Sequence, residues 1–290
     1  MHSDEIDITE SLVKYLISEQ FPHWATLPIK PVQSSGTSNA IFRLSDAMAV
    51  RMPRIPSVAE NIAREFEWLP KLAAHLPYPV PIPLAMGEPS ENYPWDWSIC
   101  QWVEGENPVE GQLMKPHVFA KELAKFIRAL HEIKIEGGPE SFRGRPLVVQ
   151  NEEAQIAIKE LHGKINTERA LSIWNECLKI PAWKGKSVWI HGDLMPGNLL
   201  VKNNSLSAVI DFGCFGTGDP ACDLISAWNL FDTQSREIFK KELQVDEATW
   251  LRGQGWALSM ALIQLPYYEY TNPVMAANAR YTINQVVSSV

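Results

Sequence analysis

Hydrophobic and polar positions follow two different periods along the chain, one typical of strands and one typical of helices. In the first hundred residues or so, four short stretches have strand character, either alternating or continuously apolar: 28–34, 40–44, 47–52 and 97–103. Two segments with a helical period accompany them, residues 9–20 and residues 57 to about 75. Ser57 and Glu60 form a capping box that predicts the start of the second helix.

After residue 104, the apolar positions recur mainly at helical spacing. The clearest case is 116–133, where one face is apolar and the other carries Lys and Glu. Further helices are predicted at 152–162, 167–178, 219–230, 235–243, 246–265 and 274–288. Residues 77–83 (PYPVPIP) predict an extended, stiff connector.

The segment 189–220 departs from this helical pattern. It reads WIHGDLMPGNLLVKNNSLSAVIDFGCFGTGDP, and three short apolar runs in it each border a polar residue. Asn203-Asn204-Ser205 is a turn signal between the second and third runs, so those runs are expected to form a hairpin. The polar residues at the edges of the runs are Asp193, Asn198 and Asp211.

These three residues supply the oxygen ligands that phosphate chemistry requires. A hairpin would bring Asn198 at its start close to Asp211 at its end. A carboxylate beside an amide oxygen is a hard ligand pair suited to Mg²⁺. Asp193 lies five positions before Asn198, on a tight loop that contains Gly and Pro, and is expected to face the same ion.

Composition removes several other classes of function. The chain has 290 residues and a formal net charge of −8, which argues against a partner nucleic acid held by a basic surface. Its four cysteines have no paired spacing, so reduced thiols in the cytoplasm are expected. The acidic N-terminus lacks the apolar region of a signal peptide, and no apolar run is long enough to span a bilayer.

The ordered motifs of the 189–220 segment resemble those of one known family. His191-Gly192-Asp193 is followed by Asn198, then by Ile210-Asp211-Phe212-Gly213, and then by Gly218-Asp219-Pro220 with Asp223. This string is similar to the aminoglycoside phosphotransferase family, small-molecule kinases of the protein-kinase-like fold, and Gly192 stands where protein kinases have Arg. The resemblance implies an α+β fold with two lobes. Residues 1–104, with an antiparallel sheet plus helix, would bind nucleotide, and the larger, mostly helical lobe at 105–290 would carry the catalytic and acceptor-binding groups.

The resemblance also implies roles for individual residues. Asp193 would be catalytic and accept the proton of a substrate hydroxyl, while Asn198 and Asp211 would hold Mg²⁺. Asp223 would support the catalytic loop through backbone N–H groups, and Asp219 is a candidate helix cap.

For the nucleotide, ATP or GTP, the resemblance implies contacts in the first lobe. A small-residue loop would approach the phosphates; it comprises Ser35, Gly36, Thr37, Ser38 and Asn39. Arg51 occupies the position of the usual strand lysine, with Arg54 as a nearby competitor, and Glu65 would orient the cation. Gln101, Trp102 and Val103 would contact the base edge.

The substrate stays open at the level of sequence. The family favours transfer to an aminoglycoside-type antibiotic, and hence antibiotic resistance, with a macrolide or a housekeeping amino alcohol or sugar as alternatives. A cationic substrate would use clustered carboxylates, for which the candidates are Glu152, Glu153, Asp232, Asp246, Glu247 and Glu269. An apolar substrate would use the C-terminal aromatics. A nucleotide-binding module without catalysis is a further alternative, and a monomer is expected.

Overall fold

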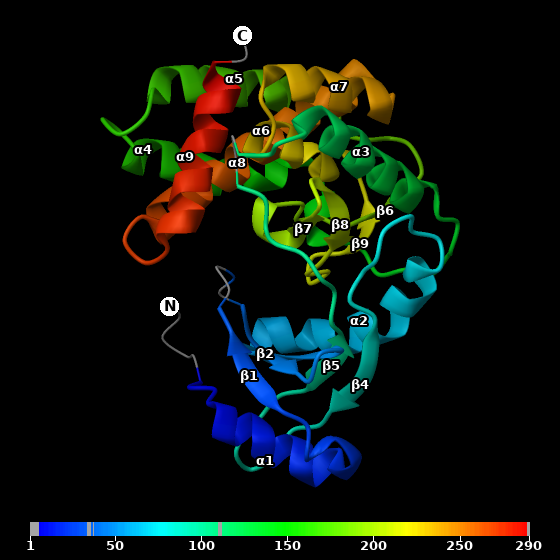
Figure 1. The fold of residues 1–290 in the computed structure, drawn as a ribbon. Coiled ribbons are helices and arrows are strands. Elements are labelled where there is room, and N and C mark those ends of the chain that lie inside the picture. Colours follow the sequence, from blue (N-terminus) through cyan, green and yellow to red (C-terminus); the bar gives the residue numbers. More distant parts are fainter. Residues whose placement is uncertain (1–5, 34–35, 37, 110–111, 289–290) are drawn as a thin grey trace. The chain divides into compact units, whose positions relative to one another are not determined.

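The computed structural model describes residues 6–33, 36, 38–109 and 112–288. The chain divides into two compact units (Figure 1). The first comprises Met1–Ala74 with Pro79–Glu104, and the second comprises His75–Tyr78 with Gly105–Val290.

The first unit is built on a five-stranded antiparallel sheet. Its strand order is β1-β2-β3-β5-β4, with bounds Ile29–Val32, Asn39–Leu44, Met48–Pro53, Trp97–Gln101 and Pro83–Gly87 respectively. The four predicted strands are confirmed. The fifth, β4, was not predicted, because its prolines read as a connector. Proline is tolerated there because β4 lies at the sheet edge.

Helices cover both faces of this sheet. Helix α1 (Glu10–Gln20) is capped by Thr9 and packs Leu16 into the cluster that contains Val50 of β3. Helix α2 (Pro56–Ala73) packs on the other face (Figure 1). Arg51 of β3 points to that face, where it meets Glu65 of α2, because neighbouring strand residues face opposite sides. The predicted capping box is wrong: α2 starts at Pro56, which is pre-organised for a first helical position, and Ile55 precedes it without a side-chain cap.

The second unit is mostly helical. Its longer helices match the predicted segments: α3 (Pro116–Glu132), α4 (Asn151–Glu160), α5 (Thr167–Lys179), α7 (Thr233–Leu243), α8 (Glu247–Tyr268) and α9 (Pro273–Val287). The helix expected at 219–230 is instead a 3₁₀ helix, η5 (Pro220–Ile225), followed by the short α6 (Ser226–Asn229). Two further 3₁₀ helices, Phe142–Gly144 and Leu147–Gln150, were not predicted.

Helix α8 is the centre of this unit. Most of its residues from Thr249 to Leu265 are buried, and α4, α5, α9 and η5 pack around it. A Cβ on Gly253 would lie 2.8 Å from Leu224 Cβ and 3.0 Å from the Ala221 carbonyl oxygen, so this residue allows η5 to approach the helix closely. Within the described ranges, no helix has both the length and the apolar character that crossing a membrane requires.

Two small antiparallel pairs complete the second unit. Strand β6 (Val188–Ile190) pairs with β9 (Gly216–Gly218), and β7 (Leu199–Lys202) pairs with β8 (Ser205–Val209). Between β7 and β8, Asn203 and Asn204 have φ angles of 55° and 63°, as a tight hairpin turn requires. The predicted hairpin is therefore confirmed.

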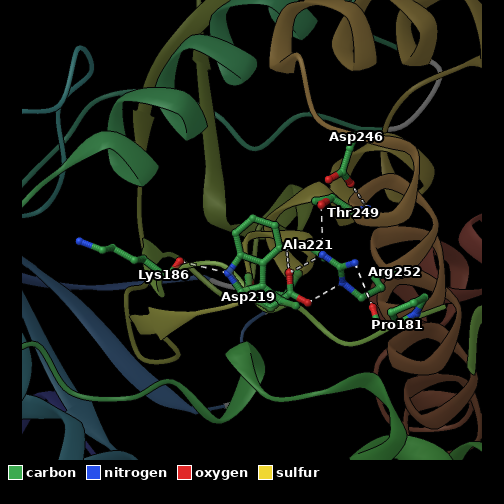
Figure 2. Close-up of polar contacts among 9 residues, drawn as sticks. Pro181, Lys186, Asp219, Ala221, Asp246, Thr249 and Arg252 are labelled. Atoms are coloured by element: carbon green, nitrogen blue, oxygen red, sulfur yellow. Dashed lines mark hydrogen bonds and ion pairs between the residues drawn. The ribbon is translucent and has the colours of Figure 1, made fainter.

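A buried ion pair ties η5 to α8 (Figure 2). The Arg252 guanidinium donates from Nε to Asp219 Oδ2 at 2.7 Å and from Nη2 to Asp219 Oδ1 at 3.2 Å, and Nη2 also donates to Thr249 Oγ1. Asp219 in addition accepts from the Ala221 N–H, which confirms it as the cap of η5. Because both charges are buried, each depends on the other for its stability.

Replacing Arg252 with Met should therefore destabilise the protein by about 3–5 kcal/mol, since it leaves the Asp219 carboxylate buried without its counter-charge. The free energy of unfolding is measured by urea denaturation for the single variant and for the double variant Arg252→Met with Asp219→Asn. The double variant should recover part of the loss because its capping oxygen remains while the unpaired charge is gone. A single variant within about 1 kcal/mol of wild type would contradict the account.

Candidate active site

The loop that follows β6 is held in place by one buried carboxylate. Asp223, which is fully buried, accepts hydrogen bonds from the backbone N–H groups of His191 at 3.1 Å and Gly192 at 2.8 Å. Its Oδ2 also lies 2.9 Å from His131 Nε2. This confirms the predicted support of the loop by Asp223.

The His191 ring connects this loop to the end of β8. Its Nδ1 accepts a hydrogen bond from the Asp193 N–H at 3.2 Å, and its Nε2 lies 3.0 Å from the Ile210 carbonyl oxygen. An N–H can only donate and a carbonyl can only accept, so the ring proton must be on Nε2. The buried His191 ring also packs edge-on against the Phe212 ring, with 4.6 Å between the two ring centroids. His191 thus fixes the backbone on both sides of the site.

The three predicted chemical residues lie together within the second unit. Asn198 Nδ2 donates to the backbone oxygen of Asp193 at 2.8 Å and to its Oδ2 at 2.9 Å. The Ile210 N–H donates to the Asn198 backbone oxygen at 2.9 Å, which sets Asp211 beside Asn198. Asp193 and Asp211 are close enough that the charge of Asp211 acts on the pKa of Asp193.

Burial is the largest influence on the Asp193 carboxyl, and it raises the pKa of this group. The positive charge of Arg143 lowers that pKa, the negative charge of Asp211 raises it, and the hydrogen bond from Asn198 lowers it. The net pKa is above the usual range of an aspartate. A carboxylate whose pKa is raised is a better proton acceptor near neutral pH.

Arg143 was missed by the sequence reading, because the residue is about fifty positions away from Asp193. Its segment is bonded to β9: the Ser141 N–H donates to the Thr217 oxygen at 3.1 Å and the Asp219 N–H to the Gly144 oxygen at 3.0 Å. A Cβ on Gly144 would lie 2.6 Å from the Gly218 Cα, so only glycine permits this approach. These bonds place the guanidinium where it acts on Asp193.

Gly192 leaves room for this arrangement. Its φ is +80°, and a Cβ there would lie 2.7 Å from the Cys214 carbonyl oxygen and 3.3 Å from Arg143 Cβ. A side chain such as the arginine of protein kinases therefore does not fit at this position. Arg143 brings a positive charge to the same region from another part of the chain.

Asp211 has a φ of +61°, a left-handed conformation that aspartate adopts only occasionally. A residue held in this conformation often lies at a functional site. Next to it, burial raises the pKa of the Cys214 thiol to about 12, so this cysteine stays protonated and is a poor nucleophile.

In the first unit, Arg51 and Glu65 form a buried ion pair between β3 and α2. Both side chains are less than one-tenth exposed. The pairing is the one expected from the sequence, and Arg54 has no ion pair among the described residues. A guanidinium carries five donors, more than one carboxylate can use.

The small-residue loop is described only in part. Ser35 and Thr37 lie outside the described residues. Gly36 is exposed, and the Ser38 carbonyl oxygen accepts from the Arg54 N–H at 3.0 Å. Asn39 begins β2, and its buried Oδ1 has no hydrogen-bond partner within the described part of the chain.

The residues expected at the base edge are partly engaged in the sheet. The Gln101 N–H donates to the Ile82 oxygen at 2.9 Å, and the Trp102 N–H donates to the Ala47 oxygen at 2.8 Å. The Trp102 indole also donates to Glu104. Any backbone donor for a nucleobase in this segment therefore has to come from Val103.

Most carboxylates considered for a cationic substrate have other partners. Asp232 and Asp246 cap α7 and α8 by accepting from the Ser235 and Thr249 N–H groups. Glu247 pairs with Lys240, and Glu269 pairs with both Lys164 and Arg280. Glu152 and Glu153 are exposed in the first turn of α4. Four of the six candidate carboxylates, Asp232, Asp246, Glu247 and Glu269, are thus already engaged in helix caps or ion pairs.

Residues 29–256 match the model of the phosphotransferase enzyme family. The chain belongs to this family. It is therefore a phosphotransferase, and its two units contain the antiparallel sheet and the helices of the α+β, protein-kinase-like fold expected from the sequence. No curated protein matches the sequence.

Several solved phosphotransferase structures have the same fold as this chain at low sequence identity. An aminoglycoside 2'-phosphotransferase-IIIa with GDP is 16% identical with a TM-score of 0.76, covering 97% of this chain and 99% of its own. APH(2")-IIia with GDP and kanamycin is 16% identical with a TM-score of 0.75, covering 94% and 97%. A macrolide 2'-phosphotransferase from Brachybacterium faecium is 21% identical with a TM-score of 0.61, covering 94% and 98%.

Replacing Arg143 with Gln should move the acid limb of the pH–rate profile to higher pH. Arg143 lowers the pKa of Asp193, so its loss raises that pKa, and the ionised carboxylate then forms only at higher pH. The matched control is Arg145→Gln, which removes the same charge from an exposed neighbour. Arg143→Lys should restore most of the profile. Equal profiles for the two glutamine variants would contradict the role of Arg143.

Proposed function

We propose that this phosphotransferase transfers the γ-phosphoryl group of ATP or GTP to a hydroxyl of a small molecule. The observation that carries the proposal is the cluster of Asp193, Asn198 and Asp211 on one loop and one hairpin. In this assignment Asp193 orients the hydroxyl and accepts its proton, and its raised pKa suits that task. The protein contributes mainly positioning and electrostatics, since phosphoryl transfer needs little covalent chemistry from side chains.

Mg²⁺ would be held by Asn198 and Asp211. Asn198 uses its amide nitrogen for Asp193, so its amide oxygen is the atom left to face a cation. The carboxylates of Asp193 and Asp211 repel each other, and a cation between the donors would relieve this. No group of three or more His, Cys, Asp and Glu side chains suited to a metal occurs in the described ranges, so nucleotide oxygens are expected to complete the shell. Bound Mg²⁺ neutralises charge on the phosphate oxygens.

For the nucleotide, we assign the phosphate contact to Arg51, oriented by Glu65. The loop of Ser35, Gly36, Thr37, Ser38 and Asn39 would add backbone donors, and the Gln101–Val103 segment would meet the base, mainly through Val103. Solved relatives of the same fold contain GDP or ADP, which supports a nucleoside triphosphate as donor without choosing the base. The alternative of a non-catalytic module rested on Arg51 standing where lysine is usual. The ion pair of Arg51 with Glu65 weakens that alternative, because the arginine is held in the way expected of the lysine.

The substrate we propose first is an aminoglycoside-type antibiotic, with resistance as the consequence. APH(2")-IIia has been solved with kanamycin and APH(2")-IIa with gentamicin. A macrolide, or a housekeeping amino alcohol or sugar, is the alternative, and a macrolide 2'-phosphotransferase shares the fold. We also propose a cytoplasmic monomer, on the ground of four unpaired cysteines and the use of a nucleotide donor.

Asp193→Asn should lower kcat by about 10²- to 10⁴-fold, the usual contribution of a positioned proton acceptor. Nucleotide affinity should stay near that of wild type, because Asp193 is assigned to the hydroxyl and not to the nucleotide. The assay is phosphate transfer from radiolabelled ATP and GTP to aminoglycosides, macrolides and amino alcohols. Asp46→Asn, at an exposed turn, is the matched control. Near-normal turnover in Asp193→Asn would remove this residue from catalysis.

Arg51→Met should weaken nucleotide binding by about tenfold or more, the equivalent of one charge-assisted hydrogen bond. Arg54→Met is the comparison, since Arg54 was the competing residue in the sequence. Binding is measured by fluorescence titration with Mg²⁺-nucleotide, after the fold of each variant is verified by circular dichroism. If Arg54→Met weakens binding and Arg51→Met does not, the phosphate contact belongs to Arg54.

A further inference from the structure

The segment that precedes Pro108 lies along the outer edge of strand β7. The Glu106 N–H donates to the Val201 carbonyl oxygen at 2.9 Å, and the Val201 N–H donates to the Glu106 carbonyl oxygen at 2.8 Å. Because β7 pairs with β8 along its other edge, Glu106 occupies the edge that β8 leaves open. Asn107 comes next, and Pro108 restricts it to an extended backbone. The Asn107 side chain is thereby placed beside the turn that leads into β7.

The Asn107 amide group bonds to carbonyl groups on both sides of Asn198. Asn107 Nδ2 donates to the Gly197 carbonyl oxygen at 2.8 Å and to the Leu199 carbonyl oxygen at 2.9 Å. The Pro196 carbonyl oxygen is farther from it, at 3.5 Å. A primary amide nitrogen has two N–H donors, so it can make both of the shorter hydrogen bonds at once. One side chain therefore holds the residue before Asn198 and the residue after it.

These carbonyl groups need a donor from outside their own element. Pro196–Asn198 forms η4, a single 3₁₀ turn, and the last carbonyl groups of a helix have no partner within it. Strand β7 belongs to a two-stranded sheet, so in the described part of the chain no further strand pairs with the outer edge where the Leu199 carbonyl lies. The two donors of Asn107 thus satisfy one carbonyl from each element.

The bonds from Asn107 complete the set that fixes Asn198. The peptide group is planar, so the bond to the Gly197 oxygen also fixes the plane of the Asn198 N–H. The Asn198 carbonyl oxygen accepts from the Ile210 N–H at 2.9 Å, and its Nδ2 donates to Asp193. With the backbone and the amide nitrogen both held, the position of the Asn198 amide oxygen is determined.

Asn107 is exposed, in contrast to the fully buried Asp223 that supports the start of the loop. Replacing an exposed side chain creates no cavity in the core and usually changes stability little. A change of metal affinity on replacing Asn107 would therefore come from its bonds to the loop and not from lost packing.

We propose that Asn107 is a positioning residue for the metal site, acting on Asn198 through the Gly197 and Leu199 carbonyl groups. The inference rests on the proposed function, in which Asn198 binds Mg²⁺, and it assigns a role to a residue that does not itself coordinate the metal. A ligand that is already held in place loses less conformational freedom when it binds, so the metal is bound more tightly.

The first test measures metal affinity without turnover. Mn²⁺ is titrated into the ADP complex, and in parallel into the GDP complex, and its dissociation constant is obtained by electron paramagnetic resonance. Asn107→Leu keeps the size of the side chain but has no donor, and it should weaken Mn²⁺ binding about tenfold through the two lost hydrogen bonds. The matched control is Asn175→Leu, at an exposed position of α5, which should bind Mn²⁺ as wild type does. Equal Mn²⁺ affinity in Asn107→Leu and wild type would overturn the inference.

A double-mutant cycle separates a positioning role from a general loss of structure. If Asn107 acts through Asn198, Asn107→Leu should change Mn²⁺ affinity by about twofold at most in an Asn198→Ala background. An equal loss in both backgrounds would overturn the inference while the proposed function stands. If Asn198→Ala alone leaves Mn²⁺ affinity unchanged, the metal assignment of the proposed function fails, and the inference fails with it.

The second test needs no metal. Hydrogen exchange is followed by mass spectrometry on peptides that cover residues 195–201 of the metal-free proteins. Asn107→Leu should speed exchange in this segment, because the turn loses two of the hydrogen bonds that hold it, whereas Asn175→Leu should not. Unchanged exchange in Asn107→Leu would overturn the inference, since the loop would then be held without this side chain.

Discussion

The conformation of the loop that carries Asp193 depends on one buried charge, the Asp223 carboxylate. A carboxylate removed from water is stable only when donors surround it, and Asp223 receives the N–H groups of His191 and Gly192 and faces His131 Nε2. These bonds fix the backbone that leads into Asp193. The same loop is fixed on its other side by the His191 ring, which bridges the Asp193 N–H and the Ile210 oxygen. The loop and the hairpin are therefore parts of one hydrogen-bonded unit.

This framework brings charges together that would otherwise stay apart. The half-buried Asp193 lies between the opposing influences of Arg143 and Asp211 on its pKa, and desolvation is the largest of the three influences. The result is a carboxyl with a raised pKa that is hydrogen-bonded by Asn198. The electrostatics that suit proton transfer thus follow from packing. Arg252 and Asp219 contribute by attaching the following η5 segment to the central helix α8.

Local signals in the sequence predicted most of the elements and part of the site. The hairpin was predictable because two asparagines formed its turn, and the long helices were predictable because their apolar period is clear. The start of α2 was mispredicted, since the proline before Ser57 decided it. Strand β4 was missed because prolines are tolerated at a sheet edge. The role of Arg143 could not be predicted, because its effect on Asp193 depends on contacts between segments that are far apart in the sequence.

The most direct test of the central claim is to locate the metal. Crystals would be grown with Mn²⁺ and ADP, or with GDP if the protein prefers guanine nucleotides. Diffraction would be measured at a wavelength where manganese scatters anomalously. The account predicts an anomalous peak bound by Asn198 Oδ1 and a carboxylate oxygen of Asp211, on the side of Asn198 opposite its bond to Asp193. A peak bound elsewhere, with nucleotide present and Asn198 and Asp211 taking no part in coordination, would contradict it.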